Sequence, residues 1–500
     1  MTMPPLSADA GFYQEILARD PGCAAVRAAF AASLLAAGEA EAAIAAADEA
    51  LDTDPSLASA WLTRAAAQTR LHRHEAAAAA LERADALVPN RAEILLAWGA
   101  AFAALDRLAE AEACLQRAAL CGPDNAAVAA SLGSVLLRRG RFDAAEVECR
   151  RALALAPGLC VAHQNLAGLL ARSRPEEARF HRDAAYRDQQ VFVEPGGRAE
   201  RVVLVPSVAD TGNIPLRHLF PPARTTIIRW YVEYATPDQD RALPDHDLVF
   251  NAIGDPDRLP KLPPSAARLF ATSARPLLNP PDRVARTGRA HLPGLLAGLP
   301  DVLVPDVVRA DLGTAPASLL PALVRPIGAH GGEGIHRVAT AAALSAALSE
   351  TGPAYVTRFV DGRGPDGWYR KYRTIFIDRE PYPYHLAIGR HWLVHYWTAG
   401  MAGDAGRQAE EARFLADPAA ALGGAGMAAL RAIGARLDLD FAGIDYGVLP
   451  DGRLLVFEAN ATMLVHPEDD PEFAYRNPAV TRILEAFDAM LVRRMGVARP

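Results

Sequence analysis

The stretch "LDFAGIDYGVLPDGRLLVFEAN", residues 439–460, decides the fold of the C-terminal part of the chain. Two runs of apolar residues flank the turn sequence Pro-Asp-Gly at 450–452, which predicts a β-hairpin. Closing this hairpin brings Asp445 roughly opposite Glu458. Glu458 and Asn460 are two residues apart, so their side chains point to the same face of the second strand. The hairpin therefore predicts one patch that holds two carboxylates and an amide.

This patch has the composition of a metal site. Asp445, Glu458 and Asn460 supply hard oxygen ligands, which suit Mg²⁺, and nucleotide phosphates can complete the coordination of such an ion. A basic strand is predicted just upstream, from "RKYRTIFID" at 370–378. Its Lys371 and Arg373 share one face, and two cations on one sheet face are costly unless they are solvated or paired with anions.

A glycine-rich loop follows a predicted strand in "LVRPIGAHGGEGIHRV", residues 323–338. Glycines permit tight turns and leave backbone N–H groups free to cradle a phosphate. The spacing matches neither the Walker pattern nor the dinucleotide fingerprint. Taken alone, such a loop is more often a flexible hairpin than a phosphate site.

The region between about 201 and 310 alternates apolar strands with helical or loop stretches, which predicts a small doubly wound α/β sheet. The expected strands are "RVVLVPS" (201–207), "TTIIRWYVEY" (225–234), "DLVFNAIG" (247–254) and a strand pair in "DVLVPDVVRA" (301–310). Between them, Arg283, Arg286 and Arg289 recur at a three-residue spacing, which predicts that they share one helix face.

The first third of the chain is a repeat array. Prolines recur at a constant interval, and small residues keep the same phase between them, so that paired helices can pack closely. The prolines are at 21, 55, 89, 123 and 157, and the columns are Ala43, Ala77, Ala111, Ala145; Ala50, Ala84, Ala118, Ala152; and Ala31, Ala65, Gly99, Gly133, Ala167. This pattern resembles the tetratricopeptide repeat (TPR) in its period. The resemblance implies an all-α superhelix whose groove binds a peptide or protein, or else a scaffold or dimerisation surface.

Bulk composition narrows the class of protein. The chain has 500 residues, 51% of them hydrophobic, and a formal net charge of -7, so nothing points to nucleic acid. The sequence shows no apolar run of transmembrane length and no signal-peptide pattern, and its five cysteines have no pairing logic. We therefore expect a cytoplasmic protein without membrane partners. Lysines are rare, so an arginine can stand where relatives of this chain carry lysine.

From about Arg201 onward, the ordered segments resemble the ATP-grasp superfamily, in the branch that contains glutathione synthetase and D-alanine–D-alanine ligase. The order is a small α/β domain, a basic residue before a glycine-rich loop, a hinge strand, a basic strand, and then Asp followed by Glu-x-Asn. The resemblance implies a multidomain chain: TPR repeats at 1–190, a linker at 191–200, a pre-ATP-grasp α/β domain at 201–310 and an α+β ATP-grasp domain at 311–500.

The resemblance assigns a role to each matching residue. Asp445, Glu458 and Asn460 would hold one or two Mg²⁺ ions, with Mn²⁺ as a substitute, on the β- and γ-phosphates of ATP. Arg325, and either Arg286 or Arg289, stand where the family carries phosphate-binding lysines. Lys371 and Arg373 are the expected catalytic pair, which would hold the γ-phosphate and the acyl-phosphate.

The other assigned residues surround the nucleotide and the substrate. Gly331, Gly332 and Gly334 would close over the phosphates. Thr357, Arg358, Phe359 and Val360 would form the hinge that binds adenine, and Asp361 or Asp366 would reach the ribose. The expected substrate contacts are His395, Tyr396 and Thr462.

The resemblance implies an ATP-dependent carboxylate–amine ligase that works through an acyl-phosphate, with small-molecule or peptide substrates and an array that recruits a peptide or protein. One alternative is a kinase that stops at phosphoryl transfer. Another is a non-catalytic, nucleotide-sensing TPR scaffold. Whether the chain forms a homodimer is left open.

Overall fold

The computed structural model of the chain describes residues 10–197, 200–256, 262–310, 315–328, 332 and 334–497. It divides into two compact units. The first unit comprises Met1–Val202 and Pro222–Tyr234, and the second comprises Val203–Pro221 and Ala235–Pro500. No helix in the described ranges is long and apolar enough to cross a membrane.

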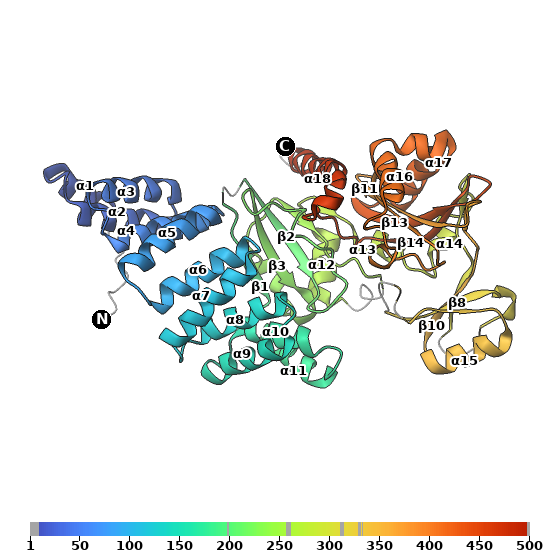
Figure 1. Cartoon of the computed structure of the whole chain (residues 1–500), viewed down its shortest axis with the longest axis horizontal. Helices are drawn as coiled ribbons and strands as arrows, with labels where there is room; N and C mark the ends of the chain where they lie inside the picture. The colour runs from blue at the N-terminus through green and yellow to red at the C-terminus, as the bar shows by residue number, and fades with distance from the viewer. Residues whose placement is uncertain are drawn as a thin grey trace. The chain divides into compact units, whose positions relative to one another are not determined.

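The first unit is a TPR-like array of helix pairs, which Figure 1 shows in blue to teal. The first helices of successive pairs begin at a constant interval, at positions 24, 58, 92, 126 and 160, as the sequence predicted. After α1(Ala10–Arg19), the pairs are α2(Ala24–Ala36) with α3(Ala40–Thr53), α4(Ala58–Arg70) with α5(His74–Leu87), α6(Ala92–Ala104) with α7(Leu108–Cys121), α8(Ala126–Arg138) with α9(Phe142–Leu155), and α10(Cys160–Leu170) with α11(Pro175–Tyr186).

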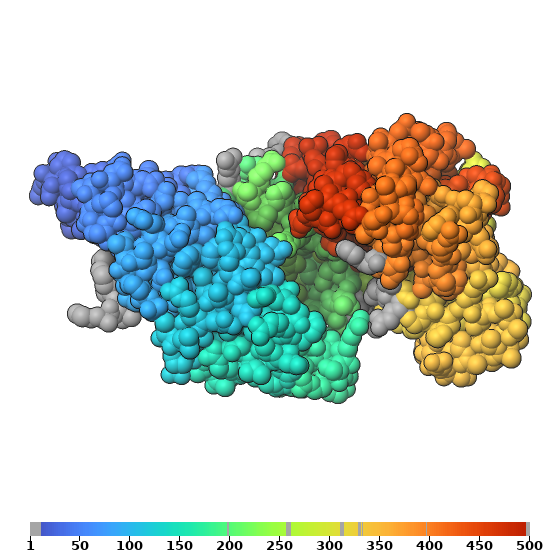
Figure 2. All heavy atoms as spheres, viewed as in Figure 1, coloured from blue at the N-terminus to red at the C-terminus, as the bar shows by residue number. Residues whose placement is uncertain are grey.

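The columns of small residues form the contacts within the array. Ala43, Ala77 and Ala111 are completely buried. A Cβ added to Gly133 would lie 2.6 Å from Cys149 Sγ, so only glycine lets α8 approach α9 this closely. Figure 2 shows the atoms of successive repeats, coloured from blue to teal, in contact with one another. The small side chains therefore set the helix spacing, as predicted.

Ion pairs run along the surface of the array at a constant separation. Arg73 donates to Glu41 at 2.9 Å, and Arg138 donates to Asp106 at 2.6 Å. Each of these pairs joins residues 32 positions apart, so the same contact recurs between neighbouring repeats. The partners remain partly exposed to solvent.

The array is followed by two strands at the end of a five-stranded sheet whose order is β1-β3-β2-β4-β5. β1(Val191–Glu194) pairs antiparallel with β3(Thr225–Tyr231), and η1(Val232–Tyr234) follows β3. Tyr186 of α11 packs against the ring of Tyr231 at a centroid distance of 4.1 Å. The linker predicted at 191–200 is therefore wrong in its first half. The apolar run that opens it is a strand. The strand predicted at 225–234 lies in one sheet with the strands at 201–207, 248–250 and 277–278, as the sequence predicted.

The second unit begins with parallel strands. β2(Arg201–Ser207), β4(Leu248–Phe250) and β5(Leu277–Leu278) lie in that order. The helices that follow β4 are α12(Pro264–Thr272), α13(Pro281–Ala285) and α14(Leu292–Leu295). The predicted α/β character is confirmed. Its expected end at 310 is wrong, because the pair β6(Val302–Leu303) and β7(Val307–Ala310) belongs to two later sheets.

Two further sheets carry the rest of the second unit. One has the order β7-β10-β8-β9, and the other has the order β12-β11-β13-β14-β6. Their strands are β8(Ala322–Pro326), β9(His336–Val338), β10(Ala354–Arg358), β11(Tyr369–Ile377), β12(Glu380–Gly389), β13(Phe441–Val448) and β14(Leu454–Asn460), with helices α15(Ala341–Thr351), α16(Ala405–Ala416), α17(Pro418–Leu437) and α18(Asn477–Val497) and the 3-10 turns η5(Tyr396–Thr398) and η6(Pro471–Arg476).

The hairpin predicted from residues 439–460 is confirmed as β13 and β14. Asp445 lies directly opposite Glu458 in the register, which shifts at the next residue, Tyr446. β11 pairs with β13 on the other side, and Arg373 lies opposite Asp445. Phe376 and Phe441 are buried in the core behind this sheet. The basic strand and the acidic hairpin therefore lie next to each other.

Candidate functional site

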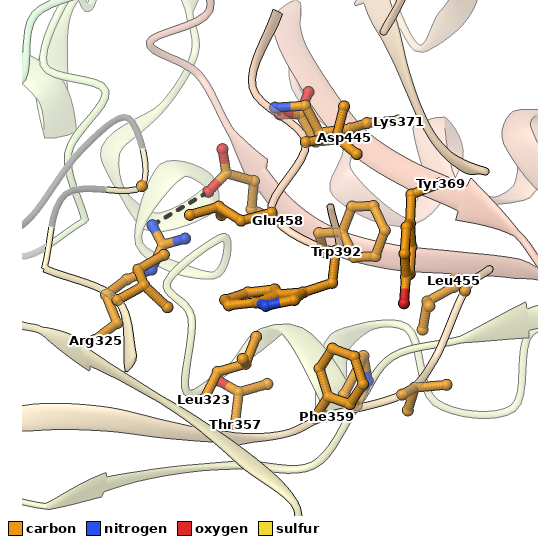
Figure 3. Close-up of a pocket in the computed structure, with 18 of the residues that line it drawn as sticks. Leu323, Arg325, Thr357, Phe359, Tyr369, Lys371, Trp392, Asp445, Leu455 and Glu458 are labelled. Carbon is orange, nitrogen blue, oxygen red and sulfur yellow. Dashed lines mark ion pairs between the residues drawn. The ribbon is translucent and has the colours of Figure 1, made fainter. Parts of the chain in front are cut away.

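The main cavity of the second unit has a volume of about 230 Å³. β8 and β10 contribute Leu323, Arg325 and Thr357 to its lining, and β11, β13 and β14 contribute residues from the opposite sheet. One end is apolar and aromatic. The other end carries most of the charge, as Figure 3 shows.

Aromatic and aliphatic side chains form the apolar end. Phe359, Tyr369, Trp392 and Leu455 all line it, and the rings of Phe359 and Trp392 meet edge to face at 5.9 Å. Sequence reasoning missed Trp392, although it expected substrate contacts at His395 and Tyr396 in the same aromatic run, because an aromatic run is more often core. Nothing in a short apolar run separates a cavity wall from a packed interior.

Asp445 lies at the centre of the charged end and is almost completely buried. Arg373 donates to both of its carboxylate oxygens, at 2.6 and 2.8 Å, and Lys371 Nζ lies 3.1 Å away. Burial alone would raise the pKa of Asp445. The charges of Arg373 and Lys371 outweigh that effect and hold its pKa below the ordinary value. Asp445 is therefore an ionised carboxylate that balances two cations.

Glu458 is the second carboxylate, and two arginines face it. Arg289 donates to Glu458 Oε2, and Arg325 Nη1 lies 3.8 Å from the same oxygen. Burial, followed by the nearby charge of Arg289, lowers the pKa of Arg325 to about 10, so it stays protonated at neutral pH. Arg289 counteracts the burial of Glu458 and lowers the pKa of this carboxyl group.

The structure distinguishes between the two arginines that the sequence left open. Arg289 lines the cavity, whereas Arg286 donates to the carbonyl of Arg436 at 3.3 Å and lies outside the lining. The shared helix face predicted for Arg283, Arg286 and Arg289 is wrong, because α13 ends at Ala285. Arg289 follows a turn, and its side chain pairs with Glu458.

Neither carboxylate expected at a ribose lines the cavity. Asp366 accepts hydrogen bonds from Arg370, one of them at 2.7 Å, and these bonds lower its pKa to about 2. Asp361 accepts from the backbone N–H of Arg363. The wall at this point is formed by Gly362 instead.

The structure brings together the four residues that were expected to form a hinge. Thr357, Arg358, Phe359 and Val360 all line the cavity. Of the three predicted loop glycines, Gly332 lines the cavity at a φ of 84°, and Gly331 lies outside the described residues. Gly334 has a φ of 67°, and a Cβ there would lie 3.0 Å from Pro326 Cγ, so the turn requires glycine, although the residue is outside the lining.

The predicted metal patch is divided between two cavities. Asp445 and Glu458 line the main cavity, whereas Asn460 and Thr462 line a small cavity of about 80 Å³. Arg289 lines both cavities, and Thr462 donates to Asn460 Oδ1 at 3.3 Å. No group of three or more His, Cys, Asp and Glu side chains suited to a metal ion occurs in the described ranges. The facing carboxylates nevertheless have the oxygen chemistry that fits Mg²⁺ when phosphate oxygens complete the shell.

A further cavity of about 120 Å³, here called the side cavity, shares Lys371, Arg373 and His395 with the main cavity. Tyr396 lines the side cavity only. Burial, followed by the charge of Lys371, lowers the pKa of His395. The predicted catalytic pair and one predicted substrate contact therefore lie where the two cavities meet.

Comparison with known structures found likeness to TPR proteins. No protein-family profile and no curated protein matches the sequence. The solved structure of YrrB, described as "a TPR protein with an unusual peptide-binding site", is 22% identical, covers 36% of this chain and 94% of its own, and has a TM-score of 0.33. A structure of MamA is 23% identical, covers 30% of this chain and 90% of its own, and has a TM-score of 0.29. A structure of Pseudomonas aeruginosa pilF is 24% identical, covers 34% of this chain and 77% of its own, and has a TM-score of 0.31. The repeat assignment rests on the constant period seen in this chain itself.

Proposed function

We propose that the second unit is an ATP-dependent carboxylate–amine ligase of the ATP-grasp type. One observation supports this above all others. A single cavity between two sheets joins an aromatic end to a cationic end, and two facing carboxylates lie among the cations.

The dimensions of the main cavity suit a nucleotide base. A cavity of about 150 Å³ holds benzene, so a volume of about 230 Å³ corresponds to a ring system of roughly the size of a purine. Phe359 and Trp392 supply faces and edges for such a ring. The triphosphate would then extend toward Arg325, Arg289 and Lys371.

Asp445 and Glu458 are the residues that would hold Mg²⁺, with Asn460 next along the strand. When bound, the ion would neutralise charge on the transferring phosphoryl group. In the protein alone, Arg373 and Arg289 already compensate these carboxylates. The same cations would be drawn toward phosphate oxygens when a nucleotide arrives.

The reaction needs positioning and charge stabilisation rather than a covalent enzyme intermediate. An oxygen of the acid attacks the γ-phosphorus, the bond to the β-phosphate oxygen breaks, and ADP leaves. The amine then attacks the acyl carbon, phosphate departs, and the amine loses a proton. Lys371 and Arg373, placed where the two cavities meet, would stabilise the negative charge of both steps.

For the repeat array we propose a recruiting role, with a peptide or protein as its partner. All described residues that line the three cavities lie between Gly254 and Val480, so the array adds nothing to these walls. It is a separate compact unit with its own buried core.

Calorimetric titration of the full chain with a non-hydrolysable ATP analogue, with and without Mg²⁺, tests the nucleotide site. We expect Mg²⁺ to strengthen binding in the wild type and to have little effect in Glu458→Gln. Arg325→Lys should keep most of the affinity and Arg325→Gln should lose it, because the first keeps the charge. Glu380→Gln, an exposed strand-end change, is the control.

Product analysis distinguishes the ligase from the other functions. Release of ADP and phosphate that requires both an acid and an amine supports the ligase. A stable phosphorylated product without an amine would identify a kinase, and nucleotide binding without turnover would identify a sensor. Absence of nucleotide binding in every condition would contradict the proposal.

A further inference from the structure

The side cavity contains a group of polar residues that the nucleotide proposal does not use. Tyr384 and His385 come from β12, Glu468 from the loop after β14, and Arg476 from η6. All four are outside the residues that line the main cavity. Because the two cavities share Lys371 and Arg373, a ligand of the side cavity would lie next to the transferring phosphate.

Arg476 is held rigidly at the wall of the side cavity. Its side chain is buried, and its Nε and Nη2 donate to Glu411 Oε1 at 3.1 and 3.2 Å. Its Nη1 donates to Glu468, and its guanidinium lies 3.9 Å from the centre of the Tyr396 ring. Fixing the plane of the guanidinium in advance reduces the entropy that is lost when a ligand binds.

Glu411 provides the anchor for Arg476. This carboxylate is completely buried and also accepts from Tyr475 Oη at 2.6 Å and from the backbone N–H of Leu386 at 3.0 Å. A buried carboxylate that accepts this many hydrogen bonds is fully satisfied. Glu411 therefore orients Arg476 without being exposed to a ligand.

The side cavity is rich in hydrogen-bond donors. Arg373 donates to Asp445 through its Nε and Nη2, and Lys371 Nζ lies close to Asp445, so each side chain has further N–H groups. His385 Nδ1 is buried and has no hydrogen-bond partner within the described chain, and it can donate in the tautomer that carries the proton on Nδ1. Among the described lining residues, Glu468 is the only carboxylate, and Arg476 already pairs with it. A ligand that supplies acceptor oxygens would satisfy these donors.

The volume limits how large that ligand can be. A cavity of about 150 Å³ holds the six carbons of benzene, so about 120 Å³ corresponds to roughly five or six heavy atoms. A carboxylate with a short carbon chain has this size, and a peptide does not.

We propose that the side cavity binds the acid substrate, and that this acid is a small carboxylic acid whose carboxylate lies between Lys371, Arg373 and Arg476. This inference rests on the proposed ligase function. One carboxylate oxygen forms the new bond to the γ-phosphorus, the bond from that phosphorus to the β-phosphate oxygen breaks, and ADP carries away the electron pair. A peptide held by the repeat array would then supply the amine rather than the acid.

The test uses the full chain with Mg²⁺-ATP, hydroxylamine as the amine, and a panel of acids from acetate and alanine to glutamate and a carboxyl-terminal peptide. Hydroxylamine converts an acyl-phosphate into a hydroxamate, which is measured directly. We expect hydroxamate from acids of up to roughly six heavy atoms and none from the larger ones. Titration with the ATP analogue is performed in parallel.

Variants of Arg476 test its role in recognition. Arg476→Gln should raise the KM for the acid by roughly 10- to 100-fold and leave nucleotide affinity unchanged. Arg476→Lys should recover part of that loss. If Arg476→Gln fails to fold, Leu464→Trp tests the same cavity. Leu464 is half exposed and lines the side cavity, so the larger tryptophan side chain should restrict the accepted acids to the smallest ones. Arg493→Gln, at an exposed site, is the matched control.

The outcomes separate the two proposals. Nucleotide binding together with hydroxamate formed only from large acids or the peptide would overturn the small-acid inference and leave the ligase standing. Nucleotide binding without hydroxamate from any acid would overturn the small-acid inference as well. Failure to bind nucleotide would overturn the proposed function on which it rests.

Discussion

Ion pairs in the two units have the same chemistry and very different surroundings. In the array, the side chains of Arg73 and Glu41 are 45% and 61% exposed. In the main cavity, those of Arg373 and Asp445 are 20% and 4% exposed. Water competes with the first pair and is largely excluded from the second.

This difference changes what each pair does. An exposed pair contributes little, because water solvates either partner when the other is removed. A buried pair depends on both partners, because the one that remains would be an uncompensated charge. Exposed pairs of the array such as Arg73 with Glu41 can therefore lose one partner at little cost, whereas the charges at the cavity form one interdependent set.

The largest expected effect comes from breaking a buried pair. Asp445→Ala should lower the free energy of unfolding of the second unit by about 3–5 kcal/mol, because Arg373 and Lys371 lose their counter-charge. Glu41→Ala should cost less than about 1 kcal/mol in the array. Scanning calorimetry in metal-free buffer can follow both changes. Equal losses in the two variants would show that burial is not the reason for the difference.

The next effect concerns packing within the array. Gly133→Ala should destabilise the array by about 1–3 kcal/mol, because the new Cβ would meet Cys149 Sγ at 2.6 Å. Gly168→Ala is the matched control, since this helical glycine has open space around it and should become more stable by about 0.5–1 kcal/mol. Urea denaturation measures both. A stabilising Gly133→Ala would contradict the close approach of α8 and α9.

The smallest effect is a pH dependence in the second unit. Burial, followed by the charge of Arg373, holds the pKa of His385 well below its ordinary 6.5. The stability that neutral His385 contributes is fully present above pH 6.5 and is lost as the pH falls below it, because only the unfolded chain then takes up the proton.

Below pH 6.5 this loss approaches roughly 1.4 kcal/mol for each pH unit. His385→Gln should flatten the slope of stability against pH, measured by urea denaturation at several pH values, whereas His336→Gln, at an exposed site, should leave it as it is. An unchanged slope in His385→Gln would show that this imidazole is not protected from protonation.

Local patterns in the sequence predicted much of the fold. The array follows from a constant period, and each helix pair makes its contacts with near neighbours. The hairpin register follows from a short turn, which fixes Asp445 opposite Glu458. Strands such as β2 were recognisable from β-branched runs, whereas the hinge role of residues 357–360 was assigned only through the family resemblance and stays a prediction.

Pairings over long distances in the chain were not predictable. β6 at 302–303 pairs in parallel with β14 at 454–455, and nothing in the short sequence of β6 predicts this pairing. Arg289 lies beyond the end of α13 and pairs with Glu458, 169 positions away. Arg476 and Glu411 form no sequence motif together. ATP, Mg²⁺ and ligation stay predictions, since they depend on chemistry that a fold alone does not determine.

The pairing of β1 with β3 limits how the repeat array can be exchanged by recombination of the gene. Because residues 222–234 group with the array while 203–221 group with the second unit, the chain passes between the units more than once. A single crossover in the gene between array and sheets would separate β3 from β1, or 203–221 from the rest of its unit. Exchange of the whole first unit by recombination therefore needs three junctions, after residues 202, 221 and 234. A product that lacks one of the paired strands would have a strand edge open to intermolecular pairing.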